Sequence, residues 1–182
     1  ESIAELADYY YHFYDAKELR STIPYDPVKA IGLYRRAATK NFSDAGYAAL
    51  QAAFGYIFHI GHLPLDWGLI ADLTHMAATK KRFMFALPYI GYMRIHGLGV
   101  TKNMRFAVQS LTRVLEEEKR ALQEEDRVLF YDITRALTRV ALGYAYEKGY
   151  MTGTPDIDSD VHYYESSHQY IVSHLANRSE EI

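Results

Sequence analysis

Histidine and aspartate supply the residue types that could bind a metal ion. His59 and His62 lie three residues apart, and residues 156–160 begin with the Asp-x-Asp-x-Asp pattern of a calcium-binding loop. A closed zinc site needs about four ligands, and no further ligand follows the histidine pair at a suitable spacing. The calcium loop needs Gly at its sixth position and Glu at its twelfth, where this chain has Val161 and Ser167. We therefore expect no metal site at either place.

The sequence motifs also give no support for catalysis. The chain contains no cysteine, which excludes disulfides, cysteine-ligated metal clusters and thiol catalysis. It lacks the glycine-rich phosphate loop, the GxSxG nucleophile elbow and the HExxH zinc helix. His162, His168 and His174 recur every six residues, but successive members of such a series lie about 120° apart on a helix and do not converge on one ion. We expect a protein without catalytic residues or cofactor.

Charge and composition exclude further classes of function. The 182 residues carry 20 Lys and Arg against 23 Asp and Glu, a net charge of −3, which disfavours a nucleic-acid backbone as the main partner. Apolar residues make up 49% and charged residues 24%, as in ordinary globular domains. No apolar stretch approaches the roughly 18–20 residues of a membrane span. The absence of cysteine favours an intracellular compartment, and the missing initiator Met leads us to expect a piece of a longer protein.

Three segments share a glycine frame that indicates an internal repeat. Residues 54–61, 90–97 and 142–149 each read apolar–Gly–Tyr, with a second glycine six residues after the first. The first two copies are 36 residues apart, and the third follows after 52 residues, which is one period plus an insertion of 16. Self-similarity at such a period is the signature of helical and other repeat architectures.

The two glycines of the frame have different predicted roles. A mid-helix glycine costs about 1 kcal/mol relative to alanine, so its recurrence predicts close approach of a neighbouring helix at Gly55, Gly91 and Gly143. The second glycine of each copy is predicted to end that helix in a left-handed conformation, at Gly61, Gly97 and Gly149.

A second frame predicts another helix after each glycine-containing one. Its members follow the leading residue at offsets of four, eight, eleven and twelve, and the leading residues are Asp26, Asp66, Asn103 and Asp160. Those offsets share one helical face, and the leading side chain can cap the first turn. The small residues at the last two offsets are predicted to allow close packing, as in the pairs Ala37–Ala38 and Ala77–Ala78.

Each unit therefore reads as two antiparallel helices joined by a glycine-containing turn. We predict an all-α solenoid of about four helix-turn-helix repeats in a single domain, with approximate units 1–42, 43–83, 84–125 and 126–182. Residues 116–127 are a mixed-charge run that we interpret as a solvated helix extension and turn, with pairs such as Glu116 with Arg120.

These residues resemble the Sel-one-like repeat, a relative of the tetratricopeptide repeat. The best-matching residues of the third unit are Ala86, Ile90–Gly91 and Gly97–Val100, and those of the first unit are Asp26, Ala30, Tyr34 and Ala37–Ala38. The resemblance covers most of the chain. It implies a right-handed superhelix that acts as a non-enzymatic scaffold or adaptor for protein–protein interaction, presenting a groove to a peptide or protein partner.

Tyrosine is the main candidate for recognition, because it combines a large apolar body with a polar tip. The chain has 17 tyrosines, and three of them directly follow the frame glycines. These can pack between units or contact a partner. The candidate partner-binding residues are Tyr56, Tyr92, Arg94, His96 and Tyr144, where Arg94 stands out because the family has Tyr or another large residue there. The tyrosine-rich first helix, residues 3–14, is predicted to contact the rest of the protein or a second copy.

Two other functions stay open. A helical-repeat RNA-binding module would need a basic surface for the phosphates. An enzyme with a site in the longer loops would need a deep polar pocket with strongly shifted titratable groups.

Overall fold

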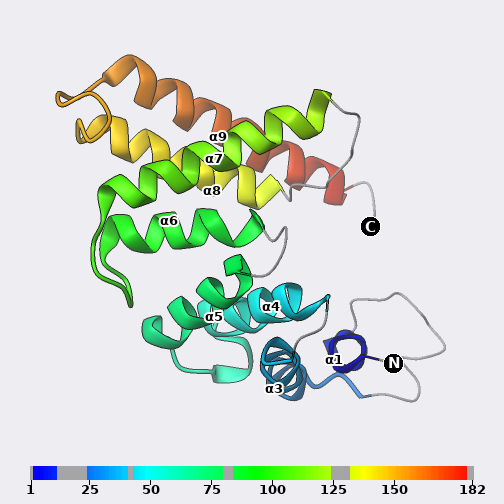
Figure 1. Cartoon of the computed structure of the whole chain (residues 1–182). Coiled ribbons are helices and arrows are strands. Elements are labelled where there is room, and N and C mark those ends of the chain that lie inside the picture. Colours follow the sequence, from blue (N-terminus) through cyan, green and yellow to red (C-terminus); the bar gives the residue numbers. More distant parts are fainter. Residues whose placement is uncertain (1, 12–23, 41–42, 80–83, 124–131, 180–182) are drawn as a thin grey trace. The chain divides into compact units, whose positions relative to one another are not determined.

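The computed structural model describes residues 2–11, 24–40, 43–79, 84–123 and 132–179. Within these ranges the regular elements are α-helices and short 3-10 helices, and no strand is present (Figure 1). The predicted all-α helical-repeat fold is confirmed. The chain forms two compact units, residues 1–86 and 87–182, while its division into four repeats stays a prediction.

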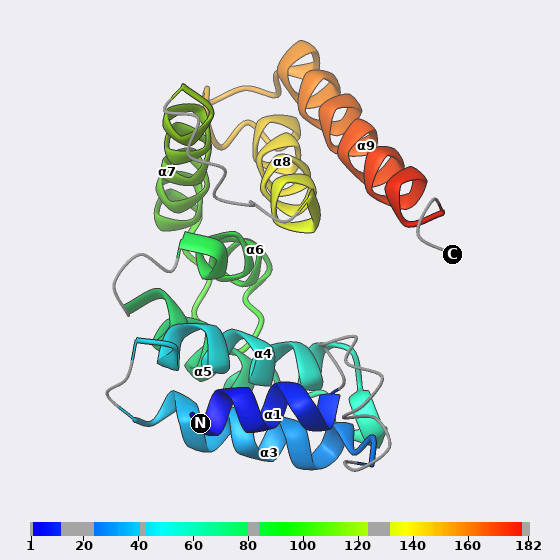
Figure 2. The same cartoon turned by 90° about the vertical axis from the view of Figure 1, so that its right-hand side faces the viewer.

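In the first unit, α4 packs between α3 and α5. The helices of this unit are α1 (Ile3–Tyr11), α3 (Pro27–Ala38), α4 (Ala45–Ile57) and α5 (Trp67–Thr79), with the 3-10 helices η1 (Ile60–His62) and η2 (Met84–Ala86). Helix α3 packs against α1 and α4, and α4 also packs against α5 (Figure 2). Small side chains let α4 approach both neighbours, and its buried alanines are Ala45, Ala48, Ala49, Ala52 and Ala53.

The second unit contains the longer helices. They are α6 (Leu87–His96), α7 (Met104–Gln123), α8 (Asp132–Glu147) and α9 (Ile157–Ser179). Helix α6 packs against α7 and α8, and α9 packs along α8 (Figure 2). The buried cluster at the meeting of α6, α7 and α8 consists of Ile95, Ala107, Leu111, Ala141 and Leu142.

Helix α1 covers part of the tyrosine-rich segment. It ends at Tyr11, and residues 12–14 lie outside the described residues. Association of this segment with another part of the protein or with a second copy stays a prediction.

Side-chain caps begin three helices where the sequence predicts them. Asp26, Asp66 and Asn103 each accept a hydrogen bond from the backbone N–H three residues later, at 2.9–3.0 Å. Each cap satisfies an N–H that has no partner inside its helix. The sequence pattern and the structure therefore agree on where α3, α5 and α7 begin.

The prediction that Asp160 caps the last helix is wrong. Asp156 accepts the N–H of Ser159 at 3.2 Å, and α9 begins at Ile157, so Asp160 lies buried one turn inside the helix. Residues one turn apart share a helical face, which is why both aspartates fit the same pattern. Counting from Asp156 places Tyr164 at the offset of eight, where the first unit has Tyr34.

The frame glycines lie where a side chain of another helix approaches their backbone. Added Cβ atoms at these glycines would lie closer than 3.0 Å to that side chain, a distance that real Cβ atoms essentially never show. The pairs are Gly55 with Ile31 Cγ1 at 2.6 Å, Gly91 with Leu111 Cγ at 2.9 Å, and Gly143 with Tyr164 Cε1 at 2.9 Å. The last two contacts face the helix that follows, whereas the first faces the helix that precedes.

Two of the three predicted helix-ending glycines have that role. Gly97 and Gly149 directly follow the last turns of α6 and α8 and have positive φ, +74° and +69°. At the end of α8, Gly149 N–H donates to the carbonyl of Tyr146, and Tyr150 N–H donates to that of Ala145, both at 2.9 Å. This is the Schellman arrangement, which satisfies carbonyls that the helix leaves unpaired.

The prediction that Gly61 ends its helix is wrong. Helix α4 ends at Ile57, and the left-handed conformation first occurs at His59, with φ of +51°. Gly61, with φ of +61°, belongs instead to the short η1 turn. A Cβ there would clash with the Val28 side-chain methyl Cγ2, so a glycine suits this position against α3.

The mixed-charge run that begins at residue 116 contains a buried ion-pair cluster. Helix α7 extends through Gln123 as predicted, but one face of the extension is covered by α8. Glu118 is 3% exposed, with Oε1 3.2 Å from Arg135 Nε and Oε2 3.1 Å from Arg139 Nη1. The prediction of a solvated run is therefore wrong for the face of α7 that α8 covers.

The exposed side of the same run carries a pair other than the one predicted. Arg120 pairs with Glu117 at 2.9 Å instead of with Glu116. Residues three apart and four apart on a helix are both neighbours, so the sequence alone does not choose between them. Residues 124–127 lie outside the described residues.

A buried carboxylate joins three helices of the first unit. Asp8 of α1 accepts a hydrogen bond from the hydroxyl of Tyr34 of α3 and, at 2.9 Å, from that of Tyr47 of α4. The two rings meet edge to face with centroids 6.0 Å apart. Burial, and after it the hydrogen bond to Asp8, raises the pKa of Tyr34 well above its usual range.

We expect the stability of the first unit to fall at alkaline pH. A tyrosine in the unfolded chain ionises with a pKa of about 10, whereas Tyr34 in the folded chain holds its proton to higher pH. The contribution is therefore complete below about pH 10 and is lost as pH rises above that value toward the folded pKa. Urea unfolding at a series of alkaline pH values measures this decline. Tyr34→Phe should decline less steeply, and an equal decline would contradict the assignment.

Candidate partner-binding surfaces

A row of aromatic rings in the second unit brings together three of the predicted binding residues. Tyr92 and His96 lie one turn apart on α6, with ring centroids 4.5 Å apart. The His96 ring lies 5.2 Å from the ring of Tyr144 on α8. His96 is exposed, and the two tyrosines are half-buried. We refer to Tyr92, His96 and Tyr144 as the aromatic row.

Two lysines modify the charge around the aromatic row. The Lys148 ammonium lies 5.4 Å from the centroid of the Tyr144 ring, a distance at which a cation is attracted to the ring face. Desolvation, followed by the charge of Lys102, lowers the pKa of His96. The imidazole is therefore mostly neutral at pH 7, and it can donate one hydrogen bond and accept another.

Tyr56 does not lie on an exposed surface. It belongs to α4 in the first unit and is 6% exposed. Its hydroxyl accepts a hydrogen bond from Arg35 Nη1 at 2.9 Å. Tyr56 therefore supports the exposed Arg35 side chain and does not itself form a binding surface.

Arg94 lies on α6 but makes contacts other than those of the aromatic row. Its Nη1 donates to the carbonyl of Thr101 at 3.3 Å, and its Cζ lies 5.1 Å from the centroid of the Phe106 ring. Asn103 N–H donates to the carbonyl of Arg94 at 3.0 Å. Arg94 therefore supports the loop between α6 and α7, which explains why a long polar side chain is tolerated at this frame position.

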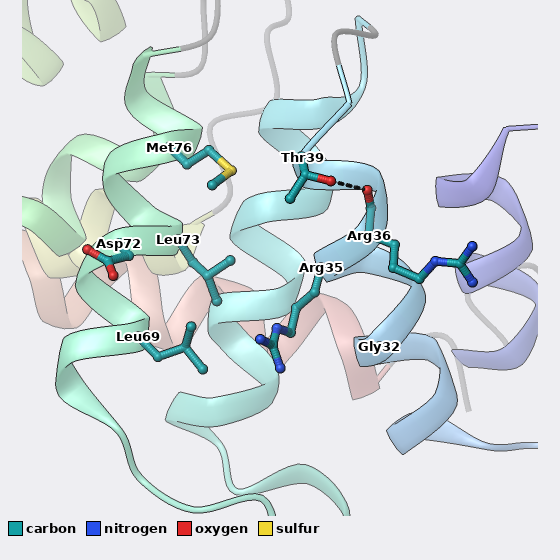
Figure 3. Close-up of a pocket in the computed structure, with 8 residues that line it drawn as sticks. All are labelled: Gly32, Arg35, Arg36, Thr39, Leu69, Asp72, Leu73 and Met76. Atoms are coloured by element: carbon teal, nitrogen blue, oxygen red, sulfur yellow. Dashed lines mark hydrogen bonds between the residues drawn. The ribbon is translucent and has the colours of Figure 1, made fainter.

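A groove of about 530 Å³ lies between α3 and α5 in the first unit. Figure 3 shows Leu69, Leu73 and Met76 of α5 projecting toward α3, and the Arg35 side chain projecting from α3 toward α5. Arg36 and Asp72 border the groove, but their charged ends point away from it (Figure 3). Thr39 and Gly32 complete the lining.

Sequence reasoning missed this groove, although one signal was present. Gly32 lies inside α3 but outside the repeat frame, and an added Cβ would meet nothing within 4 Å. A mid-helix glycine costs stability, and here no packing neighbour requires it. The missing side chain leaves open space on the α3 wall.

The predicted histidine and aspartate motifs form no metal site in the described part of the chain. Among those residues, no group of three or more His, Asp or Glu side chains is placed to hold an ion. His59, His62, His162 and His168 are exposed. The side chain of His174 lies outside the described residues. No described helix combines the length and the apolar character that crossing a membrane requires.

Comparison with known proteins identifies the family. The model of the Sel1 repeat matches residues 1–42, 89–109 and 134–167, more than half of the chain. The chain belongs to the Sel1 repeat family. Sel1 repeat proteins are generally scaffolds for protein interaction and are typically not enzymes.

A solved Sel1 repeat structure has a similar fold. The crystal structure of a Sel1 repeat protein from Oxalobacter formigenes matches with a TM-score of 0.60 at 20% sequence identity, over 92% of this chain and 57% of that chain. The present chain therefore corresponds to little more than half the length of that Sel1 repeat protein. No curated protein matches the present chain.

Proposed function

We propose that this chain is a non-enzymatic scaffold that binds a protein partner through exposed side chains of its helical repeats. The observation that carries the proposal is the aromatic row. Two tyrosines that follow frame glycines lie next to an exposed histidine, with ring centroids 4.5 and 5.2 Å from it. Large, rigid aromatic side chains supply much contact area at low entropic cost, and such residues dominate binding energies at protein interfaces.

The carboxylate next to Lys148 is paired with other side chains of the second unit. Glu147 pairs with Lys148 and accepts a hydrogen bond from Tyr164 at 3.2 Å, and these contacts lower the pKa of Glu147. Membership in a family of interaction scaffolds supports the proposed scaffold function.

A capture experiment tests the proposal. The purified chain is used as bait in lysate of its own cells, beside a Tyr92→Ala, His96→Ala double variant and a Tyr150→Ala, His168→Ala control. We expect the double variant to retain the specific protein partners about tenfold less than the control, because each truncated interface ring removes a kcal/mol or more. Far-ultraviolet circular dichroism confirms that both variants are folded.

Other outcomes would contradict the proposal in distinct ways. Equal retention by the double variant and the control would remove the aromatic row from the binding surface. Material that is lost after ribonuclease treatment would favour the RNA-binding alternative. Retention of small metabolites alone would favour an enzyme.

A further inference from the structure

We infer that the groove between α3 and α5 binds a peptide segment that carries one acidic side chain next to apolar ones, with Arg35 holding the carboxylate. The inference rests on the proposed scaffold function. It concerns the first unit and uses none of the residues of the aromatic row, so the two surfaces can be tested separately.

Arg35 is held in place before a ligand arrives. Its Nη1 donates to the Tyr56 hydroxyl at 2.9 Å, and its Cζ lies 5.9 Å from the Tyr56 ring centroid. Tyr56 is itself buried in α4, so it gives the guanidinium a fixed support. A side chain that is already ordered loses less entropy on binding, and a guanidinium can bind a carboxylate through two parallel hydrogen bonds.

The charge of Arg35 has no counterpart within the described part of the chain. No carboxylate there forms an ion pair with it. Its side chain projects toward α5, whereas the carboxylate of Asp72 points out of the groove (Figure 3). The groove therefore presents a single preordered cation, which is complementary to one negative charge.

The opposite wall is apolar. Leu69, Leu73 and Met76 lie at helical offsets of zero, four and seven, so they form one ridge along α5 and project toward α3 (Figure 3). Facing them, Gly32 leaves open space on α3. Apolar side chains of a ligand can fill this space, and the unbranched thioether of Met76 can adjust to different shapes.

The groove is large enough to receive several side chains of a ligand. Its volume of about 530 Å³ lies within the range of about 300–1,000 Å³ that is usual for ligand-binding clefts. Both walls are helices, so a bound chain can lie along the helix direction. Peptides dock in helical grooves by placing a few anchoring side chains at regular spacing, and the carboxylate and its apolar neighbours would be those anchors.

Paired synthetic peptides test the inference. Each pair is a leucine-rich segment that differs only in having Glu or Gln at its centre, and binding to the full chain is measured by fluorescence anisotropy. We expect the Glu peptide to bind about tenfold more tightly than the Gln peptide, as for a charge-assisted hydrogen bond. Arg35→Gln should abolish this preference. Arg36→Gln, the matched control whose guanidinium points away from the groove, should preserve it.

A second variant tests the groove without changing any charge. Gly32→Leu adds a side chain where a Cβ meets nothing within 4 Å, and leucine favours helix over glycine, so the fold is retained. We expect it to reduce binding of both peptides about tenfold or more by filling the space.

The inference is overturned if neither peptide binds, if Glu and Gln peptides bind equally, or if Gly32→Leu leaves binding unchanged. The scaffold function would still stand if capture of a protein partner depended on Tyr92 and His96. If peptides bind as expected but capture does not depend on the aromatic row, the proposed binding role of the row is contradicted. The inference about the groove then still holds.

Discussion

Replacing Glu118 with glutamine is expected to lower the free energy of unfolding by about 3–5 kcal/mol, the usual cost of removing one partner from a buried ion pair. Glu118 is 3% exposed and holds Arg135 and Arg139 of α8, whose side chains are 21% and 14% exposed. The glutamine would remove the charge that Glu118 presents to both guanidinium groups in a mostly buried site. Urea unfolding followed by circular dichroism measures the change.

The neighbouring glutamate provides the control. Glu117 pairs with Arg120 on the exposed side of α7, and such surface pairs contribute about 0–1 kcal/mol. Glu117→Gln should therefore change stability very little. A combined replacement of Glu118, Arg135 and Arg139 by methionine should recover much of the loss, because burial of apolar side chains avoids the desolvation of charges. Equal effects of the two single variants would contradict the buried role of Glu118.

Replacing Gly149 with alanine is expected to lower the free energy of unfolding by about 2–5 kcal/mol. The left-handed conformation costs about 1–2 kcal/mol for a residue with a Cβ, and Gly149 has φ of +69°. In addition, the new Cβ would lie 2.7 Å from the carbonyl carbon of Thr154. Overpacking of this kind adds about 1–3 kcal/mol, and a backbone atom cannot rotate away as a side-chain end can.

Gly153 allows the two costs to be separated. It lies in the same loop with φ of +81°, but an added Cβ would meet nothing within 4 Å. Gly153→Ala should therefore show only the conformational cost of about 1–2 kcal/mol. Hydrogen exchange of the α8 and α9 amides, together with urea unfolding, compares the two variants. The steric explanation fails if they are equally destabilised.

The repeat architecture could be predicted because it depends on local signals. Asp26, Asp66 and Asn103 cap their helices through bonds that span three residues, and Gly97 and Gly149 end theirs within one turn. Helical periodicity and capping act over such short distances. The contact that explains Gly91 and Gly143 also follows from the pattern, since a recurring mid-helix glycine needs a packing reason.

The errors concern registers and long-range partners. Asp156 and Asp160 are one turn apart and have the same capping ability, so the pattern could not choose between them. The burial of Glu118 depends on arginines 17 and 21 residues later, on a helix whose contact face the sequence does not reveal. A run of mixed charge usually indicates a solvated surface, and only the packing of α7 against α8 overrides that interpretation.

The candidate surface was predicted in part. The pattern of Tyr92, His96 and Tyr144 contains no information on which rings face each other across α6 and α8, although the three residues were singled out. Tyr56 occupies the same repeat position as Tyr92, yet it is buried and supports Arg35. Equivalent repeat positions therefore have different environments, because the neighbouring helices carry different side chains.

The partner of each frame glycine decides where this chain can be recombined with other repeat proteins. A chimaera joined at residue 42, where the sequence repeat ends, would separate Gly55 from Ile31 and place a foreign side chain against the glycine. A junction after Ala86 keeps Gly55 with Ile31, Gly91 with Leu111 and Gly143 with Tyr164. The exchangeable module in this chain is thus defined by its glycine contacts, and its borders differ from those of the repeated motif.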